Sequence, residues 1–189
     1  MTLYCATKNP GKLREFEAEP IPNLASIEPP EETGATFEEN AVQKATYYSK
    51  FTDGFVFADD SGLSVDALGG APGVYSARFA GPAATDADNN RLLMEKLRGV
   101  EDRTARYVCV IALALRGALI TTFRGEVEGR IIDQPRGTSG FGYDPYFFYP
   151  PFDCTFGEAS LGQKHNVSHR GQALRKMRAY LQALPGNQS

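Results

Sequence analysis

Two long β-type runs, separated by a short turn signal, constrain the fold more than any other feature of this sequence. Residues 106–115 and 119–131 are rich in Val, Ile, Thr and aromatic residues, and Arg-Gly-Ala divides them. Runs of this kind on either side of a short Gly-containing turn predict a β-hairpin. Because a hairpin requires antiparallel pairing, a sheet made of parallel strands alone is excluded.

Segments with strand and helix patterns alternate around this hairpin. We expect further short strands at residues 2–6, 24–27, 55–58, 63–68 and 145–150. We expect helices over residues 12–17, 36–50 and 85–98, and a final helix capped by Ser168. The sequence therefore predicts an α/β fold with a mixed β-sheet flanked by helices. Residues 1–189 are expected to form a single domain, since no linker or internal repeat divides them.

Composition excludes several classes of protein. The net charge of −3 and the pI of about 5.5 argue against a broad nucleic-acid-binding face. The longest apolar run, residues 107–115, is far shorter than a bilayer requires, so no membrane association is expected. Two of the three cysteines, Cys5 and Cys109, lie in apolar runs, which predicts reduced thiols and a cytoplasmic location. The first residues lack the pattern of a signal peptide.

A polar loop at residues 7–12, Thr-Lys-Asn-Pro-Gly-Lys, lies between an expected strand and an expected helix. The start of a helix presents backbone N–H groups and a positive dipole, both of which favour an anion such as phosphate. The loop lacks the G-x-x-x-x-G-K-[ST] pattern of a P-loop. An ordinary polar turn is therefore the alternative interpretation.

Carboxylates occur at two places that favour a metal site. Glu39 follows Thr36 at capping-box spacing, and Asp59 and Asp60 follow an apolar run. A helix cap and an Asx turn at a strand end are the structural alternatives. In extended backbone adjacent side chains point to opposite faces, so only one aspartate would face a site. Glu39 with one aspartate would provide oxygen ligands of the kind that Mg²⁺ takes beside phosphates and water.

Aromatic and cationic residues gather in two later stretches. Residues 137–148, GTSGFGYDPYFF, either pack into the core as a β-turn or form a wall on which a base stacks. Residues 164–174 offer hydrogen-bond donors near the start of the last helix. His165 and His169 lie on either side of Ser168, so they do not form a metal pair on one helix face, and His165 is expected in a surface loop.

Taken in order, five motifs resemble one enzyme family. They are TxNxxK, TFxENA, ADDSGLxVDALGGAPGVYSARFAG, GTSGFGYDPxF and KxxxSHRGQAL, and they run from Thr7 to Leu174. The set resembles the noncanonical purine nucleoside triphosphate pyrophosphatases, the inosine/xanthosine triphosphate pyrophosphatase family. The resemblance implies an elongated mixed sheet with two lobes around a central nucleotide cleft, and a homodimer. It also implies Mg²⁺-dependent hydrolysis of ITP, dITP and XTP to the monophosphate and pyrophosphate, which cleanses the nucleotide pool.

The resemblance also assigns site residues. Glu39 and Asp60 match Mg²⁺ ligands, Asp60 matches the proton acceptor, and Asp59 would support it. The remaining positions match substrate contacts: Thr7, Lys8, Asn9, Pro10, Gly11 and Lys12 for the phosphates, Ser61 for the substrate without a stated part, and Phe141, Gly142, Tyr143, Asp144, Lys164, His169 and Arg170 for the base, with Phe141 as the stacking ring. The sequence departs from the family at residues 18–35, which are shortened, and at Lys8, where many relatives carry a small residue. No role follows for Arg78.

Two other functions are compatible with part of this pattern. A related pyrophosphatase for modified pyrimidine nucleotides shares the broad fold, but it would lack the Ser-His-Arg segment at residues 168–170. A non-catalytic nucleotide-binding module would not need the two carboxylates Glu39 and Asp60. Purine nucleoside triphosphates, and not nucleic acids or membranes, are therefore the expected partners.

Overall fold

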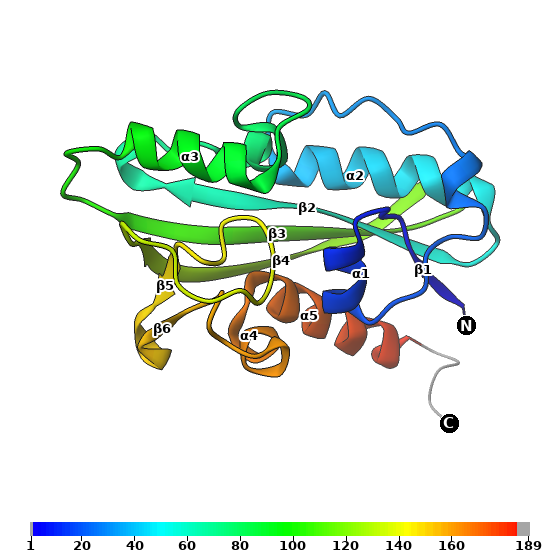
Figure 1. Ribbon diagram of the computed structural model, residues 1–189. Coiled ribbons are helices and arrows are strands. Elements are labelled where there is room, and N and C mark those ends of the chain that lie inside the picture. The colour runs from blue at the N-terminus through cyan, green and yellow to red at the C-terminus, as the bar shows by residue number, and fades with distance from the viewer. Residues whose placement is uncertain (1, 185–189) are drawn as a thin grey trace. The chain divides into compact units, whose positions relative to one another are not determined.

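The computed structural model describes residues 2–184 and contains one six-stranded sheet in the order β1-β2-β3-β4-β5-β6 (Figure 1). The strands are β1 (Leu3–Cys5), β2 (Phe55–Val65), β3 (Thr104–Leu115), β4 (Ala118–Ile131), β5 (Phe147–Tyr149) and β6 (Cys154–Thr155). The helices are α1 (Pro10–Phe16), α2 (Phe37–Tyr48), α3 (Asp86–Lys96), α4 (Leu161–Val167) and α5 (His169–Ala183). Short 3-10 helices cover Leu24–Ser26, Ser49–Phe51, Asp66–Leu68, Gly73–Arg78 and Pro150–Phe152.

The mixed sheet predicted from the sequence is confirmed. β1 pairs with β2 in parallel, with Leu3 opposite Phe55, whereas β5 pairs antiparallel with both β4 and β6. Arg116 and Gly117 form the tight turn between β3 and β4, and both have positive φ, 49° and 83°. Such turns match the right-handed twist of the strands they join, which explains why the hairpin forms here.

The chain divides into two compact units. Unit 1 comprises residues 1–60, 109–125 and 169–189, and unit 2 comprises residues 61–108 and 126–168. β2, β3 and β4 each contribute residues to both units. The sequence predicted one domain with two lobes around a cleft; the cleft stays a prediction. Within residues 2–184, no helix combines the length and the apolar character needed to cross a membrane.

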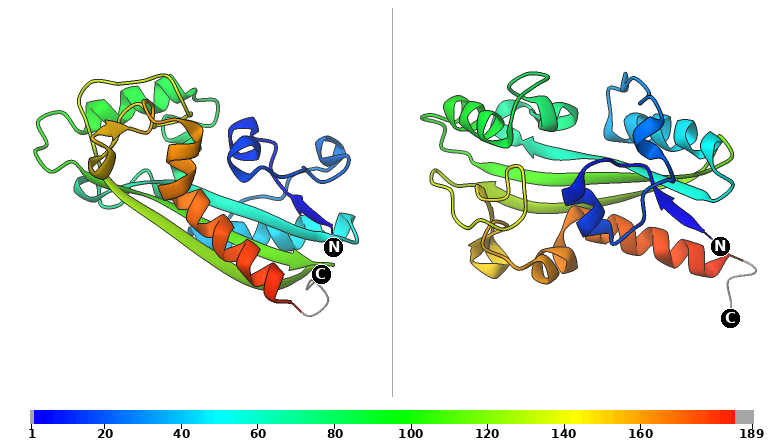
Figure 2. Two further views of the ribbon diagram at one scale, coloured as in Figure 1. Left: turned by 90° about the horizontal axis from the view of Figure 1, so that it is seen from below. Right: turned by 45° about the vertical axis from the view of Figure 1, so that its right-hand side comes forward.

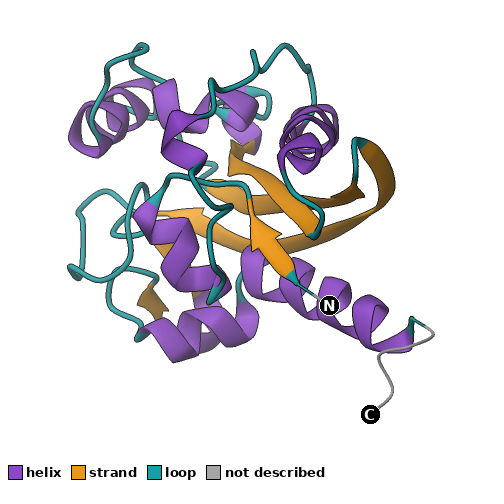
Figure 3. Ribbon diagram, turned by 90° about the vertical axis from the view of Figure 1, so that its right-hand side faces the viewer, coloured by secondary structure: helices purple, strands orange, loops and turns teal. Residues whose placement is uncertain are grey.

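Unit 1 is built in three layers. Its strands lie between α2 on one face and α1 and α5 on the other (Figures 1 and 3), and α5 runs alongside the strands (Figure 2). The α2 side of the core contains Val56, Ala58, Val110, Ala112, Ala41, Ala45 and Tyr48. The α5 side contains Phe55, Phe57, Cys109, Ile111, Phe16, Leu174 and Met177. In the part of β2 that belongs to unit 1, even-numbered residues therefore face α2 and odd-numbered residues face α1 and α5, as strand alternation requires.

Unit 2 has its own apolar core. Residues of β2, β3 and β4 pack there with α3 and with aromatic side chains from residues 143–156. Tyr107, Phe147 and Phe156 form the centre of this core, with ring centroids 4.6 to 6.1 Å apart. The abundance of Phe and Tyr in the sequence thus serves the packing of this unit.

The Asp59–Asp60 pair does not form a turn. The predicted strand at 55–58 continues through both aspartates to Val65, so the separate strand predicted at 63–68 is wrong, and Asp66–Leu68 is a 3-10 turn. Both aspartates are buried, at 2% and 7% exposure. The backbone remains extended because cations and an amide from neighbouring helices compensate the two buried charges, as described below.

Three other local predictions differ from the structure. Residues 24–27 form a 3-10 turn instead of a strand, because the N–H groups of Ser26 and Ile27 donate to the nearby carbonyls of Asn23 and Leu24. His165 lies half-buried in α4 and not in a surface loop. The helix predicted from Lys12 begins at Pro10, a residue suited to the first helical position.

A glycine in β4 lets α5 approach the sheet within unit 1. A Cβ built on Gly125 would collide with the backbone carbonyl oxygen of His169 and would lie 2.9 Å from the backbone nitrogen of Ala173. Backbone atoms of a packed helix cannot rotate away as a long side chain can. Only glycine therefore allows this contact between β4 and the start of α5.

Gly125→Ala should lower the free energy of unfolding by about 1–3 kcal/mol, because the added methyl group overpacks this contact. Urea unfolding of the purified variant measures the loss. Gly162→Ala is the control, since a Cβ at that position in α4 meets nothing within 4 Å. Equal stability of the Gly125 variant and the wild type would refute the close approach.

Candidate functional site

Asp59 faces α1 and α5 within unit 1 and is surrounded by cations. Its Oδ2 lies 2.9 Å from Lys12 Nζ and 3.8 Å from Arg170 Nε. Burial alone would raise the pKa of Asp59, but Lys12, Arg170 and Lys44 together lower it below its ordinary value. Asp59 is thus a fixed anion that joins α1 and α5 to the sheet.

Asp60 faces α2 and has a different environment. Its Oδ2 accepts a hydrogen bond of 3.0 Å from Asn40 Nδ2, and its Oδ1 lies 3.8 Å from Lys44 Nζ. Burial raises the pKa of Asp60, and Lys44 and Asn40 offset that effect only in part. Strand alternation has therefore given two adjacent carboxyl groups opposite pKa shifts.

Glu39 lies in the first turn of α2, next to Asn40. Thr36 caps the helix by accepting from the Glu39 N–H, but the Glu39 carboxylate accepts from the N–H of Ala35, at 2.7 Å, and not from Thr36. The predicted capping box is thus half right. Asn40 also accepts from the N–H of Gly34, at 2.8 Å, and so fixes the chain that leads into the helix. The helix turn that carries Glu39 is tied to Asp60 through Asn40.

The polar loop at residues 7–12 leads from β1 into α1. Asn9 is the N-cap of α1, and its Oδ1 accepts from the N–H groups of Gly11 and Lys12 at 2.8 and 3.2 Å. These two amides therefore already have a partner within the chain. Thr7 accepts from the Asn9 N–H, and the exposed Lys8 makes a long 3.5 Å contact with the carbonyl of Ile27. Asn9 and Pro10 are exposed.

The start of α5 brings two predicted base contacts into unit 1. His169 and Arg170 are 1% and 7% exposed. Arg170 Nη1 donates to Glu15 Oε2 at 2.8 Å, in addition to its approach to Asp59. Burial lowers the pKa of Arg170, but Glu15 and Asp59 reverse this effect and raise it overall. Arg170 thus has a structural role in holding α5 against α1.

Unit 2 brings Phe141, Asp144 and Lys164 together. Lys164 Nζ donates to Asp144 Oδ2 at 2.6 Å, and both side chains are 3% exposed. Tyr107 donates to Asp144 Oδ1 and the Phe141 N–H donates to Asp144 Oδ2. Lys164 Nζ lies 5.2 Å from the centre of the Phe141 ring, within cation–π range. The carboxylate of Asp144 therefore organises this group.

We call residues 137–146 the aromatic loop. Within it, Phe141 and Gly142 are half-buried, whereas Tyr143 is 5% exposed and its hydroxyl donates to the carbonyl of Ser76 at 2.7 Å. Phe141 is therefore only partly covered, whereas Tyr143 anchors the loop. The half-buried Ser61 follows Asp60 in β2 and belongs to unit 2.

Glu39 and Asp60 suit a divalent cation that is completed by other ligands. Within residues 2–184, no group of three or more His, Cys, Asp and Glu is placed to hold a metal by itself. Mg²⁺, however, typically takes only one or two carboxylates and completes its shell with phosphates and water. Glu39 and Asp60 provide oxygen donors of this type, and the buried Asp60 lacks full compensation by Lys44. The chemistry of the donors therefore fits Mg²⁺.

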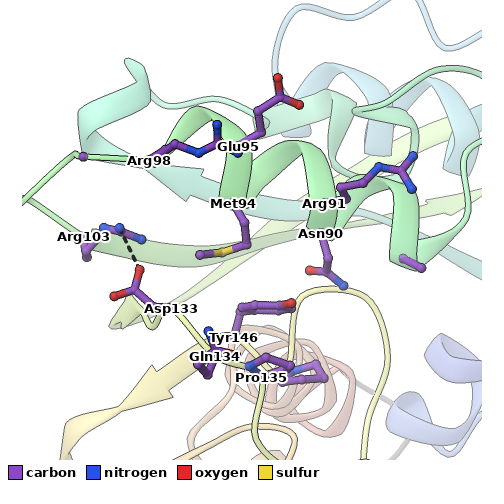
Figure 4. A pocket seen from close by; sticks show the side chains of 13 residues that line it. Asn90, Arg91, Met94, Glu95, Arg98, Arg103, Asp133, Gln134, Pro135 and Tyr146 are labelled. Carbon is purple, nitrogen blue, oxygen red and sulfur yellow. Dashed lines mark ion pairs between the residues drawn. The ribbon is translucent and has the colours of Figure 1, made fainter.

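An open pocket of about 1020 Å³ lies elsewhere in unit 2, between α3 and residues 133–135 (Figure 4). Arg103 and Asp133 form an ion pair of 2.8 Å in it, and Asn90 and Tyr146 also line it. None of the described residues that line this pocket is a predicted site residue. The pocket borders the aromatic loop through Tyr146.

Sequence reasoning missed several residues that hold the predicted ones. Lys44 and Asn40 contact Asp60, Glu15 pairs with Arg170, and Tyr107 contacts Asp144. Asn40 lies inside the TFxENA motif, so its position next to Glu39 was an available signal. For Glu15, Lys44 and Tyr107 the sequence contains no local signal, because their partners lie in distant parts of the chain.

Replacing Asp59 or Asp60 by Asn should change stability at pH 7 in opposite directions. The lowered pKa of Asp59 means that its ionisation stabilises the fold above about pH 4, and that this stabilisation is lost as the pH falls through its folded-state pKa. Asp59→Asn should cost about 3 kcal/mol. The raised pKa of Asp60 means that its ionisation costs stability as the pH rises through that pKa, so Asp60→Asn should raise the free energy of unfolding.

Urea unfolding with EDTA, at pH 7 and pH 4, measures both effects. The gain from Asp60→Asn should largely vanish at pH 4, because the carboxyl group is then about half protonated in the unfolded state and more fully protonated in the folded state. The loss from Asp59→Asn should largely persist there. A loss of similar size for both variants at pH 7 would contradict the different environments of the two aspartates.

Comparisons with known proteins give the family. The model of the Ham1 family matches residues 3–180. A protein of Acidobacterium capsulatum named dITP/XTP pyrophosphatase is 50% identical, with 98% of this chain and 99% of the relative covered. A protein of the same name from Bacillus licheniformis is 52% identical, with 93% and 95% of the two chains covered.

Solved structures agree with this result. The Ham1 protein of Coxiella burnetii is 40% identical, has a TM-score of 0.87, and matches 97% of this chain and 100% of its own. The Staphylococcus aureus Ham1 protein is 39% identical, has a TM-score of 0.86, and matches 96% and 98% of the two chains. With the matched region spanning nearly its whole length, this chain belongs to the Ham1 family.

Proposed function

We propose that this protein hydrolyses dITP, ITP and XTP to the nucleoside monophosphate and pyrophosphate. The observation that carries the proposal is the identity of about 50% to proteins named dITP/XTP pyrophosphatase, over nearly the full length of both chains. The two buried aspartates with different pKa shifts support a catalytic role for this region of unit 1.

We assign Asp60 as the general base and Glu39 with Asp60 as the ligands of Mg²⁺. When bound, Mg²⁺ supplies positive charge that offsets the charge of the phosphate oxygens. Asp60 accepts a proton from the water that attacks the α-phosphorus, because its raised pKa makes it a better base than an exposed aspartate. Asn40 holds Asp60 through the hydrogen bond to Oδ2, and Lys44 keeps the neighbouring oxygen close to a cation.

The phosphate chain is assigned to residues 7–12 and Ser61. Because Asn9 already occupies the N–H groups of Gly11 and Lys12, the side chains of Thr7, Lys8 and Lys12 are the main donors in this assignment. Lys12 also bonds to Asp59, which holds its ammonium group in a fixed place. Such fixed positive charge can stabilise the departing pyrophosphate without reorganisation.

The purine base is assigned to Phe141 and the donors near it. Phe141 offers a half-buried ring for stacking, with Gly142, Tyr143, Asp144 and Lys164 as its support. His169 and Arg170 are assigned to the 6-keto oxygen of the base. A guanidinium has five N–H donors, so the bond of Arg170 to Glu15 does not exhaust it. Adenine would place an amino donor against these donors and be rejected.

We further propose a cytoplasmic homodimer. The homodimer rests on the family resemblance alone. A reducing compartment agrees with Cys5 and Cys109, which are buried free thiols whose pKa values are raised by burial. Light scattering of the purified protein measures the oligomeric state.

Incubation with Mg²⁺ and either dITP, XTP, dTTP or ATP tests the reaction and the substrate class together. Pyrophosphate should be released from dITP and XTP but not from ATP or dTTP. Orthophosphate as the first product would overturn the reaction type. Preference for pyrimidine nucleotides would favour the related pyrimidine pyrophosphatases, and binding without any turnover would indicate a non-catalytic module.

Asp60→Asn and Glu39→Gln should each lower kcat by at least about 100-fold, as expected for loss of a general base or of a metal-ligating carboxylate. Glu38→Gln is the matched control, since Glu38 lies in the same turn but bonds to Thr122, an interaction that Gln retains. Full activity of Asp60→Asn would remove it as the base.

A further inference from the structure

Two side chains of α3 hold one residue of the aromatic loop. Asp86 Oδ2 accepts from the N–H of Gly142 at 2.8 Å, and Asn90 Nδ2 donates to the carbonyl of Gly142 at 2.9 Å. Asp86 and Asn90 are four residues apart, so they lie on the same face of the helix. Both backbone polar groups of Gly142 are thus held by α3, within unit 2.

The held residue is one that cannot be fixed by its own side chain. Gly142 has a φ of +64°, and a Cβ built on it would meet nothing within 4 Å. It lies between the half-buried Phe141 and Tyr143, which is anchored to Ser76. Without a partner for its backbone, Gly142 would let the Phe141 ring move, because glycine has access to many conformations.

Neither Asp86 nor Asn90 is explained by the stability of the helix alone. The capping box of α3 is formed by Thr85 and Asp88, and Asp86 takes no part in it. In Asn90 the amide nitrogen bonds to Gly142, while the buried oxygen Oδ1 has no hydrogen-bond partner. A buried acceptor without a partner is costly, and it indicates that the amide is oriented for the bond to Gly142. Figure 4 shows Asn90 between α3 and the aromatic loop.

We propose that Asp86 and Asn90 are positioning residues that hold the aromatic loop with the Phe141 ring set to stack on the purine base. The inference rests on the proposed function, in which Phe141 binds the base. It adds two residues outside the family motifs quoted above, and it places the origin of base affinity partly in α3.

Substitutions of Asn90 and Asp86 test the two hydrogen bonds. Asn90→Asp replaces the donor by an acceptor that faces the Gly142 carbonyl, and Asp86→Ala removes the acceptor. Each should raise KM for dITP about 10-fold, as expected for loss of one buried hydrogen bond, with kcat changed less than about 2-fold. Asp86→Asn keeps an oxygen that can accept from Gly142 and should restore the wild-type KM.

Asp88→Ala is the matched control for helix stability. It removes the carboxylate that accepts from the N–H and the hydroxyl of Thr85, which is half of the capping box of α3, without touching Gly142, so it should lower the melting temperature but leave KM unchanged. Binding of inosine, which has a base but no phosphate, should weaken about 10-fold in Asn90→Asp. Inhibition by inorganic pyrophosphate, which has no base, should remain unchanged.

Hydrogen exchange of the Gly142 amide measures its bond to Asp86 without an activity assay. Exchange should be at least about 10-fold faster in Asp86→Ala than in Asp88→Ala or the wild type. Unchanged exchange and unchanged KM in Asp86→Ala, or an equal rise in KM in Asp88→Ala, would overturn the proposal. If the wild type releases no pyrophosphate from dITP or XTP, the proposed function fails, and the exchange measurement still decides whether α3 holds Gly142.

Discussion

The site in unit 1 depends on the alternation of side chains along β2. Because successive residues of a strand point to opposite faces, Asp59 meets Lys12 and Arg170 while Asp60 meets Asn40 and Lys44. Asp59 holds two helices to the sheet and has a lowered pKa. Asp60 is compensated less completely and has a raised pKa. One local rule therefore gives two chemically identical neighbours different partners and opposite pKa shifts, and it explains why two like charges can stand side by side in a buried strand.

In unit 2 as well, some predicted site residues are held by bonds within the chain while others are less covered. Asp144 and Tyr143 are buried and hold the aromatic loop through Lys164, Tyr107 and Ser76, whereas Phe141 is half-buried. A stacking ring needs such support, because the energy of stacking is lost if the ring must first be ordered. The hydrogen bonds from Asp86 and Asn90 to the backbone of Gly142 extend this support to α3. Most of the polar groups predicted as substrate contacts are thus also bonded within the chain, which fixes them in advance of binding.

Local signals in the sequence predicted the elements whose formation is local. The β3–β4 hairpin follows from two β-type runs and a turn that accepts positive φ, and the start of α2 follows from Thr36. The continuation of β2 through Asp59 and Asp60 could not be predicted, because aspartate disfavours strands and the compensating groups come from other helices. The contacts on Gly142 span 52 and 56 residues of sequence, so no local pattern indicates them. The family motifs identified the candidate residues, but only the structure shows which of them have partners within the chain.

A pH titration of the Asp59 and Asp60 carboxyl carbons by NMR, in metal-free protein, tests the different environments of the two aspartates directly. Asp60 should titrate above the ordinary aspartate pKa of about 4 and Asp59 below it. Two carboxyl groups that titrate together near the ordinary value, or in the reverse order, would contradict the separation of roles along β2.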